Sequence, residues 1–119
     1  MVYDKNNVFA KILLKEIPCK LVYEDQYVMS FHDINPEAPV HVLVIPKQEV
    51  ASFEDLVECG NEALGNFFKS VDAVVKTLSL SKDGFRAVFN HGKNGLQTVP
   101  HFHLHLLGGE ELSSVLNRR

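Results

Sequence analysis

The chain has 119 residues, a formal net charge of −3, 45% hydrophobic and 23% charged residues, and six histidines. This length predicts one domain spanning residues 1–119, with the composition of an ordinary globular protein. Lysine and arginine are spread thinly, which argues against polymeric nucleic acid as a partner. A single nucleotide needs no basic run, because main-chain N–H groups and neutral side chains can hold one phosphate.

Charged residues interrupt the N-terminal stretch, so the apolar core of a signal peptide is missing. No uncharged apolar run approaches the roughly 20 residues needed to span a bilayer. Cys19 and Cys59 are far apart and in no metal-type spacing, which is typical of reduced thiols. We therefore expect a cytoplasmic protein with neither a disulfide nor a membrane contact.

The N-terminal half predicts a short helix followed by three strands. Apolar residues recur at helical spacing over 8–16, before the first proline. Segments 20–25 and 27–34 are rich in β-branched and aromatic residues and predict a hairpin. Two prolines within 35–39 hold the chain extended. The run 40–46 is the most hydrophobic and predicts a central strand covered on both faces.

From Glu54 to about Leu80, apolar residues recur every three or four positions, which predicts one face of a long helix. Gly60 breaks this helix into two segments. Ser52 or Asn61 supplies an N-cap for them in this interpretation.

The C-terminal part predicts two more strands, at 85–91 and 101–107, joined by a glycine-bearing loop at 92–97. The resulting order is one helix, three strands, a long helix and two strands. Because the strands follow one another in runs, we expect an α+β fold with a five-stranded antiparallel sheet, one short helix and one long helix.

Three of the six histidines occupy alternate positions in the last predicted strand: His101, His103 and His105. Side chains of a strand alternate between its faces, so these rings form a row with successive Cα atoms about 6–7 Å apart. The opposite face, which is expected to pack on the long helix, carries Phe102, Leu104 and Leu106.

Three interpretations fit this row. The first is a structural or solvated ladder, although packing gives no reason for three imidazoles. The second is a zinc site, although the segment lacks an acidic residue or a fourth ligand. The third is a nucleophilic histidine between two acid–base partners, because imidazole titrates near pH 6.5 and crowding keeps one ring neutral. His103 has a neighbour on each side and is the candidate nucleophile.

The loop before the row offers neutral hydrogen-bond donors and two glycines: Asn90, Gly92, Gly95, Gln97 and Thr98. Such a set can form a cradle for a phosphate or an oxyanion. Most loops of this composition only turn the chain. Beside a histidine row, however, the loop and the row together supply an anion cradle and a nucleophile.

The segment 95–107 resembles the His-x-His-x-His-x-x signature of the histidine triad (HIT) family. Segments 9–18, 31–47 and 90–99 resemble its branch of histidine triad nucleotide-binding proteins, the Hint branch. The resemblance covers 8–109 and leaves 110–119 as a tail. It implies a homodimer whose two five-stranded subunits share one continuous sheet. It also implies a purine nucleoside phosphoramidase, which needs no cofactor and hydrolyses the P–N bond between AMP or GMP and an amine.

The resemblance assigns roles to four histidines. His103 attacks the α-phosphorus and expels the amine, and water then releases the monophosphate from the nucleotidyl-histidine intermediate. A main-chain carbonyl holds its other ring nitrogen. His101 and His105 contact phosphate oxygens or the leaving group. His41 adjoins the row, although the residues alone fit a polar side chain near a strand start equally well.

The resemblance also implies a nucleotide site. Asp33 accepts hydrogen bonds from the ribose hydroxyls, as carboxylates do for vicinal diols, although a lone aspartate after a strand is more often a turn residue. Sugar and phosphate contacts fall to Asn90, Gly95, Gln97 and Thr98. The base pocket is lined by Val8, Phe9, Ile12, Phe31, His32, Ile34 and Leu43. Core packing explains the aliphatic members equally well.

The chain departs from the family pattern at several positions. Leu96 stands where many relatives have a second glycine, Thr98 replaces a common serine, and Pro100 replaces an aromatic residue. The tail 110–119 lacks tryptophan and resembles the bacterial form. These differences leave the choice of amine and the preference for AMP or GMP open.

Two other functions remain open on the sequence. One is a nucleotide-binding regulatory module that acts through a protein partner. The other is a hydrolase that uses zinc held by the row. The retained third histidine argues against the transferase branch of the family, in which glutamine often replaces it.

Overall fold

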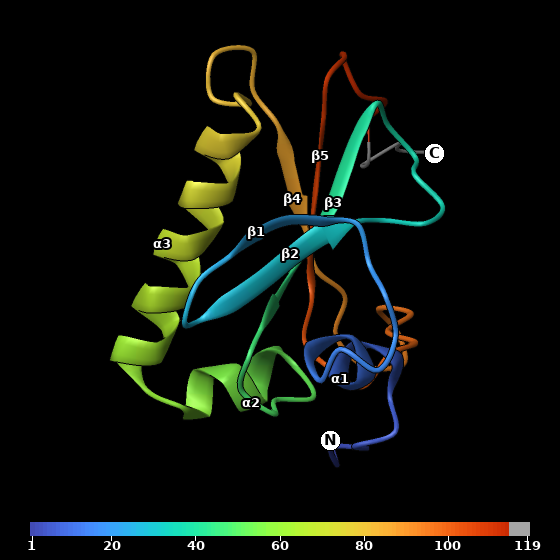
Figure 1. Ribbon diagram of the computed structural model, residues 1–119, viewed down its shortest axis with the longest axis vertical. Helices are drawn as coiled ribbons and strands as arrows, with labels where there is room; N and C mark the ends of the chain where they lie inside the picture. Colours follow the sequence, from blue (N-terminus) through green and yellow to red (C-terminus); the bar gives the residue numbers. More distant parts are fainter. Residues whose placement is uncertain (115–119) are drawn as a thin grey trace.

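The computed structural model describes residues 1–114, so the last part of the expected tail, 115–119, lies outside the described residues. Figure 1 shows an α+β fold with a five-stranded antiparallel sheet, as the sequence predicts. The elements are α1 (Val8–Leu13), β1 (Leu21–Glu24), β2 (Val28–His32), β3 (Val40–Pro46), α2 (Phe53–Glu58), α3 (Asn61–Thr77), β4 (Arg86–Val88) and β5 (Leu104–Gly108).

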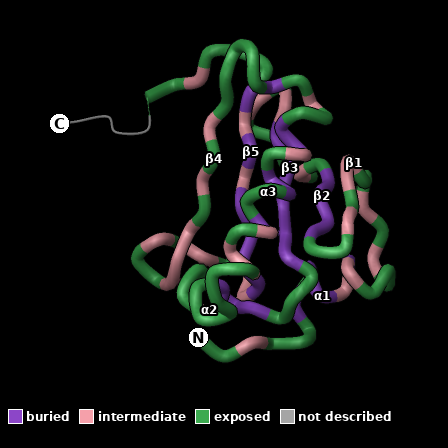
Figure 2. The backbone as a smooth tube through the Cα atoms, turned by 90° about the vertical axis from the view of Figure 1, so that its left-hand side faces the viewer, coloured by how far each residue is buried: buried purple, intermediate pink, exposed green. Residues whose placement is uncertain are grey.

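The strands lie in the order β1-β2-β3-β5-β4, and every neighbouring pair is antiparallel. β3 is the central strand and is buried along almost its whole length, as its uninterrupted apolar sequence predicts. β1 and β4 form the two edges, where Figure 2 shows half-buried and exposed backbone. The sheet therefore places its most hydrophobic strand between two covering layers.

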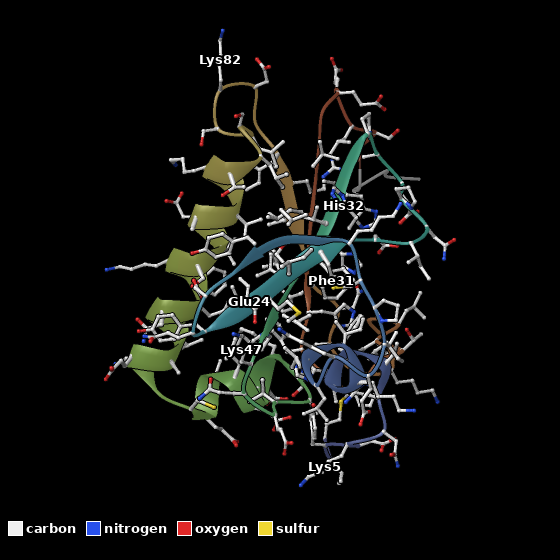
Figure 3. All side chains as sticks on the ribbon, viewed as in Figure 1. Lys5, Glu24, Phe31, His32, Lys47 and Lys82 are labelled. Atoms are coloured by element: carbon white, nitrogen blue, oxygen red, sulfur yellow. The ribbon has the colours of Figure 1, made fainter. Side chains whose placement is uncertain are left out.

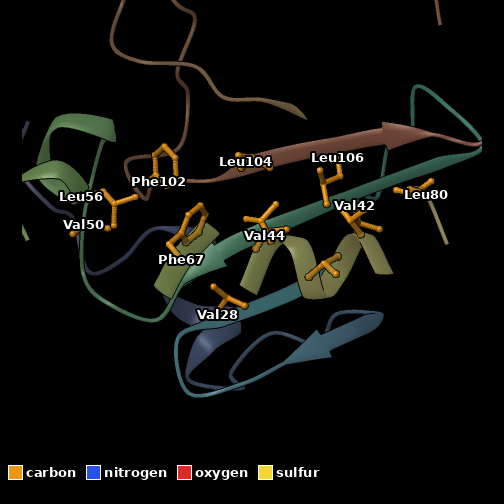
Figure 4. Close-up of a cluster of buried hydrophobic side chains, with 13 residues drawn as sticks. Val28, Val42, Val44, Val50, Leu56, Phe67, Leu80, Phe102, Leu104 and Leu106 are labelled. Carbon is orange, nitrogen blue, oxygen red and sulfur yellow. The ribbon is translucent and has the colours of Figure 1, made fainter. Parts of the chain in front are cut away.

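The helix α3 covers one face of the sheet (Figure 1) and closes the larger hydrophobic cluster. The sheet side of this cluster includes the expected apolar face of the last predicted strand (Figure 4): Val28, Val42, Val44, Phe102, Leu104 and Leu106. The α3 side contributes Phe67, Val71, Val74 and Val75. Burying each such side chain stabilises the fold by about 1.5–3 kcal/mol.

The short helix α1 covers the opposite face. Asn7 caps it, because its Oδ1 atom accepts the Ala10 N–H at 2.8 Å. The second, smaller cluster lies between α1 and strands β2 and β3, and it consists of Phe9, Ile12, Met29, Phe31, Leu43 and Ile45. This second layer brings an N-terminal helix over the part of the sheet that carries the histidines.

The expected long helix is divided into α2 and α3. Ser52 caps α2 as predicted, since its hydroxyl accepts the Asp55 N–H at 3.4 Å. The prediction that Asn61 caps the second segment is wrong, because Gly60 occupies the N-cap position with φ +100°. That conformation favours glycine, so the break and the N-cap of α3 are the same residue.

The last predicted strand begins later than expected. β5 starts at Leu104, which pairs with Val44, and only His105 of the three alternating histidines lies within it. Continuing this register would place Phe102 opposite Pro46, which has no N–H to donate. The Phe102 N–H instead donates to the Val50 oxygen at 2.8 Å. The chain from 101 to 103 is therefore an extended approach to β5. The other late strand is also short, since β4 covers only 86–88 of the expected 85–91.

Both cysteines are free thiols, with Cys19 half-buried and Cys59 exposed. Among the helices of residues 1–114, none is both long and apolar enough to cross a membrane.

Asp25 ties the turn between β1 and β2 to α3. Its Oδ1 atom accepts the N–H groups of Tyr27 and Val28 at 2.7 and 2.9 Å. Its Oδ2 atom accepts the hydroxyls of Tyr23 and Ser70 at 2.9 and 2.7 Å. Burial by itself would raise the pKa of the carboxyl, but these four hydrogen bonds hold the pKa below its ordinary value of 3.8.

Leu96 has a backbone conformation that few leucines adopt. Its φ angle is +61°, in the left-handed region, while its side chain is 79% exposed and gains little from packing. Glycine enters this region without a steric penalty. The backbone thus explains why a glycine at this position suits the loop better than leucine.

We predict that Asp25→Ala lowers the free energy of unfolding at pH 7 by about 2–3 kcal/mol, because it leaves buried donors without an acceptor. Since the folded-state pKa of Asp25 is lowered, its contribution is present above the unfolded value and is lost as pH falls through the folded value. Urea unfolding of the wild type and of Asp25→Ala, at pH 7 and near pH 3, measures this difference in the free energy of unfolding. Asp72→Ala, in an exposed pair with Lys76, is the control and should cost less than about 0.5 kcal/mol. An equal loss in both variants would contradict the assignment.

We predict that Leu96→Gly raises the free energy of unfolding by up to about 1 kcal/mol, because the left-handed strain is relieved. Urea unfolding of the variant measures this. Leu14→Gly provides the comparison, since Leu14 is 69% exposed but has an ordinary φ of −81°. That variant should lose stability, and a loss of the same size in Leu96→Gly would refute the strain argument.

Candidate active site

The four histidines expected to act together come from three segments. His41 lies on β3 and His105 on β5, on the same face of the sheet, because Leu43 is paired with His105 and alternation puts His41 beside them. His101 and His103 lie in the extended approach to β5. The rings of His103 and His105 are 5.4 Å apart between centroids. The structure therefore brings the expected group together, although not as one row on one strand.

His101 is completely buried, and both of its ring nitrogens are occupied. Nε2 lies 2.8 Å from the main-chain oxygen of Pro46, and Nδ1 lies 2.7 Å from the hydroxyl of Tyr3. A carbonyl oxygen only accepts, so Nε2 carries the hydrogen and Nδ1 accepts from the hydroxyl. Burial, with a smaller contribution from nearby His103, lowers the pKa of His101 to about 4 against the opposing effect of the carbonyl bond.

These contacts correct the role expected for His101. A neutral, enclosed ring with no free nitrogen does not reach a phosphate oxygen or a leaving group. Its main-chain oxygen does contribute to the site, because it accepts a hydrogen bond from the next histidine in the series.

His103 has the geometry of a nucleophile. Its Nδ1 atom donates to the main-chain oxygen of His101 at 2.7 Å, the carbonyl contact that the family resemblance implies. The hydrogen therefore sits on Nδ1, and Nε2 keeps its lone pair. Burial lowers the pKa of His103, against the opposing effects of that carbonyl bond and the charge of Asp33. The ring is consequently neutral at pH 7, which is the form that attacks an electrophile.

Phe9 of α1 fixes the position of this ring. The edge-to-face contact between Phe9 and His103 has a centroid distance of 4.8 Å and an interplanar angle of 68°. Phe9 also touches Phe31 of β2 at 5.8 Å, so the ring of His103 rests on the second hydrophobic cluster. The ring is only 8% exposed.

His41 and His105 form a second directed pair. The Glu37 N–H donates to Nδ1 of His41 at 3.0 Å, so Nε2 of His41 carries the hydrogen. Nε2 lies 2.9 Å from Nδ1 of His105 and 3.4 Å from Oδ2 of Asp33. His105 therefore accepts at Nδ1 and carries its own hydrogen on Nε2. Burial, followed by the neighbouring His103 and His41, lowers the pKa of His105 to about 4.

The potential metal ligands that converge within residues 1–114 differ from the expected row. One ligand atom each from Asp33, His41 and His105 lies within 4.8 Å of the others. A metal on Nε2 of His41 would require the lone pair there, yet the Glu37 N–H already requires the lone pair of Nδ1. In this arrangement the donor set does not fit zinc. The zinc-bound row is also excluded for His101, whose nitrogens are both occupied.

A cavity of about 360 Å³ opens beside His41 and His105, which is large enough for a small ligand. Its lining consists of Glu37, His41, Arg86, Val88, Asn90, His105, Leu107, Leu112 and Ser113. His103 is not part of this lining, although its ring contacts that of His105, which is. Sequence reasoning missed Arg86, whose guanidinium suits a phosphate. The available signal was a charged residue within an otherwise apolar strand.

The loop before the row has a fixed shape. Oε1 of Gln97 accepts the Gly92 N–H at 3.0 Å, and Nε2 donates to the oxygens of Ala51 and Val99 at 2.6 and 3.0 Å. The amide is fully used, so the expected contact of Gln97 with phosphate is corrected to a supporting role. At Gly95, a Cβ atom would lie 2.6 Å from the His91 oxygen, so only glycine fits.

The other two residues expected to hold the sugar and phosphate, Asn90 and Thr98, differ in their burial. Asn90 is half-buried in the cavity wall, and Thr98 is exposed. Both remain candidates for contact with a ligand.

The expected base pocket is only partly assembled. Phe9, Ile12, Phe31 and Leu43 all belong to the second cluster. Val8 is 40% exposed and Ile34 is 92% exposed, so both are accessible.

His32 does not lie with the other residues expected to line the base pocket. It pairs with Val42, which faces α3, while the preceding Phe31 pairs with Leu43. Strand alternation therefore places His32 on the opposite face, and Figure 3 shows both residues near the end of β2.

Comparison with known proteins agrees with this architecture. The HIT domain model matches residues 14–112. The chain is 38% identical to an HIT-like protein of Rickettsia prowazekii over 98% of both chains. It is 36% identical to the purine nucleoside phosphoramidase of Escherichia coli K12 over 94% of both chains.

The fold is likewise that of a solved HIT family hydrolase from Legionella pneumophila. The two share 41% identity and a TM-score of 0.84, with coverage of 91% of this chain and 96% of that structure. The buried histidines, their fixed hydrogen positions and these matches lead to one conclusion: this chain belongs to the HIT domain family.

Proposed function

We propose that this protein is a purine nucleoside phosphoramidase that hydrolyses the P–N bond of AMP or GMP phosphoramidates. The observation that carries the proposal is the bond from Nδ1 of His103 to the His101 oxygen, which leaves Nε2 as an unprotonated nucleophile. The similarity to the Escherichia coli phosphoramidase supports the choice of substrate.

In the first proposed step, the Nε2 lone pair of His103 forms a bond to the α-phosphorus while the P–N bond breaks. The electron pair of that bond leaves with the amine nitrogen, which takes up a proton. In the second step, water attacks phosphorus and loses a proton to the group that protonated the amine, the bond to His103 breaks, and the nucleoside monophosphate leaves. Because imidazole is both a good nucleophile and a good leaving group, one difficult displacement becomes two easier ones. No metal ion takes part.

We assign the proton for the amine to His105. Its Nε2 carries a hydrogen, and the residue lines the cavity. The pKa of His105 is low in the protein alone because the ring is buried among other imidazoles. An anionic phosphoryl group raises the pKa of a neighbouring imidazole. Substrate binding therefore favours the imidazolium, which gives up the proton on Nε2. In that state Nδ1 of His105 also carries a hydrogen, so it no longer accepts from Nε2 of His41.

The nucleotide contacts remain proposals of the same kind. Asp33 is half-buried beside His41 and offers a carboxylate to the ribose hydroxyls. Val8 and Ile34 present accessible apolar surface to the base. Asn90 and Arg86 face the cavity, where they can hold phosphate oxygens.

We also propose a homodimer that continues the sheet across β4. This edge strand carries unpaired main-chain groups, and Ala87 at its centre is exposed. Phe53 and Phe89 stack beside it at 5.0 Å and are both partly exposed. An unprotected edge next to exposed aromatic rings suits pairing with a second copy about a twofold axis.

We predict that His103→Ala lowers kcat on adenosine phosphoramidates by roughly 10⁴-fold or more, because the covalent route is lost. AMP binding, measured by calorimetry, should persist. Rapid base quenching of the wild type, followed by mass spectrometry, should reveal an adenylate on residue 103, and acid quenching should remove it. A panel of AMP and GMP phosphoramidates with different amines defines the preferred substrate.

Two results would count against this function. Full turnover by His103→Ala would exclude the covalent mechanism. A wild-type protein that binds AMP but hydrolyses no member of the panel would favour the nucleotide-binding regulatory module instead.

We predict that Ala87→Lys converts the dimer into a monomer, because two lysines would face each other near the twofold axis. Sedimentation velocity measures the mass of both forms. Leu21→Lys places the same charge on the opposite edge strand, β1, and should leave the dimer intact. A dimer that persists in Ala87→Lys would show that the subunits join elsewhere.

A further inference from the structure

Tyr3 belongs to the segment before α1 and has no role in the chemistry proposed above. Its hydroxyl nevertheless lies 2.7 Å from Nδ1 of the fully buried His101. The two rings meet edge-on, with centroids 5.5 Å apart and an angle of 63°. The contact joins residues at opposite ends of the chain.

The direction of this hydrogen bond follows from its neighbour. Nε2 of His101 donates to the Pro46 oxygen, so Nδ1 of the neutral ring is an acceptor and Tyr3 is the donor. Because the ring of His101 has no solvent exposure, water does not readily replace the hydroxyl. Removing the hydroxyl leaves a buried nitrogen without a partner.

The N-terminal segment holds Tyr3 in place through its own contacts. The Asn7 side chain donates to the Asp4 oxygen at 2.7 Å, and the Asn7 N–H donates to the same oxygen at 3.1 Å. Lys5, at the lower end of the molecule in Figure 3, pairs with Glu49 at 4.0 Å. The segment is thus folded as a turn that leads directly into α1.

The position of His101 also affects the proposed nucleophile, His103. The main-chain oxygen of His101 accepts the Nδ1 hydrogen of His103, so a tilt of residue 101 changes the direction in which Nε2 of His103 points. Displacements of about 1 Å at a reacting centre can cost about 100-fold in rate. A neutral His101 also avoids placing a second positive charge beside His103 when phosphorus is bound to it.

We propose that Tyr3 is a positioning residue for catalysis: its hydroxyl holds His101 in the neutral form that carries its hydrogen on Nε2, and His101 in turn orients His103. This inference rests on the proposed phosphoramidase function. The N-terminal segment lies outside the histidine signature, and through Tyr3 it takes part in the active site.

The kinetic test compares Tyr3→Phe with Tyr23→Phe on an adenosine phosphoramidate. Both variants lose a hydrogen-bonded phenolic hydroxyl, but that of Tyr23 donates to Asp25 at the β1–β2 turn. We expect Tyr3→Phe to lower kcat by about tenfold with KM unchanged, because the nucleophile is misaligned while the substrate pocket is intact. Tyr23→Phe should leave kcat unchanged, whatever its effect on thermal stability.

The second readout is the nitrogen resonances of ¹⁵N-labelled histidines in the intact protein. In the wild type, Nε2 of His101 should be protonated and Nδ1 should resonate as a hydrogen-bonded acceptor. In Tyr3→Phe, the Nδ1 resonance should shift toward that of an unbonded nitrogen or show the other tautomer. Tyr23→Phe should leave it in place.

Unchanged kcat in Tyr3→Phe, or unchanged His101 resonances, would overturn the positioning role. A fall in kcat of the same size in Tyr23→Phe would overturn it too, because the loss would then reflect general destabilisation. A wild type without any turnover is a different result, since it refutes the proposed function itself and the positioning role with it.

Discussion

The hydrogen bond between Nδ1 of His103 and the main-chain oxygen of His101 is the contact on which the site depends. It decides which ring nitrogen holds the hydrogen and which one is free to react. The main-chain oxygen of His101 must keep its position, because it fixes the hydrogen on Nδ1 of His103. Here it belongs to a residue whose ring is enclosed and bonded on both sides, to Pro46 and to Tyr3. The proposed nucleophile is therefore oriented by residues that have no direct part in the proposed chemistry.

The two hydrophobic clusters explain why this arrangement is rigid. The larger cluster, under α3, holds the alternate side chains of β5 and of the segment before it, including Phe102 and Leu104. The smaller cluster, under α1, supplies Phe9 as a support for His103. The histidines lie on the side of the sheet that α1 covers, where burying a polar ring is costly unless its hydrogen-bonding groups are paired. Within residues 1–114 most of their ring nitrogens are paired, and the two that are not are Nε2 of His103 and Nε2 of His105.

Burial, more than mutual repulsion, keeps these imidazoles uncharged. It is the largest cause of the lowered pKa at His101, His103 and His105, and the charges of neighbouring rings add to it at His101 and His105. The same fixed hydrogens that favour a nucleophile oppose a metal at His41, since the Glu37 N–H takes its only free lone pair. These main-chain contacts thus support the proposed covalent chemistry at His103 and oppose metal binding at His41.

The sequence by itself determined the features that depend on local pattern: the central β3, the break at Gly60 and the apolar face against α3. It also singled out His103 as the candidate nucleophile. It did not determine where β5 begins, because that depends on Pro46 as the partner across the sheet. It also could not place the hydrogens of the imidazoles or exclude His101 from contact with phosphate. For His101 those properties are set by partners 55 and 98 residues away along the chain. Only the tertiary structure brings such groups within hydrogen-bonding distance, and periodicity carries no information about them.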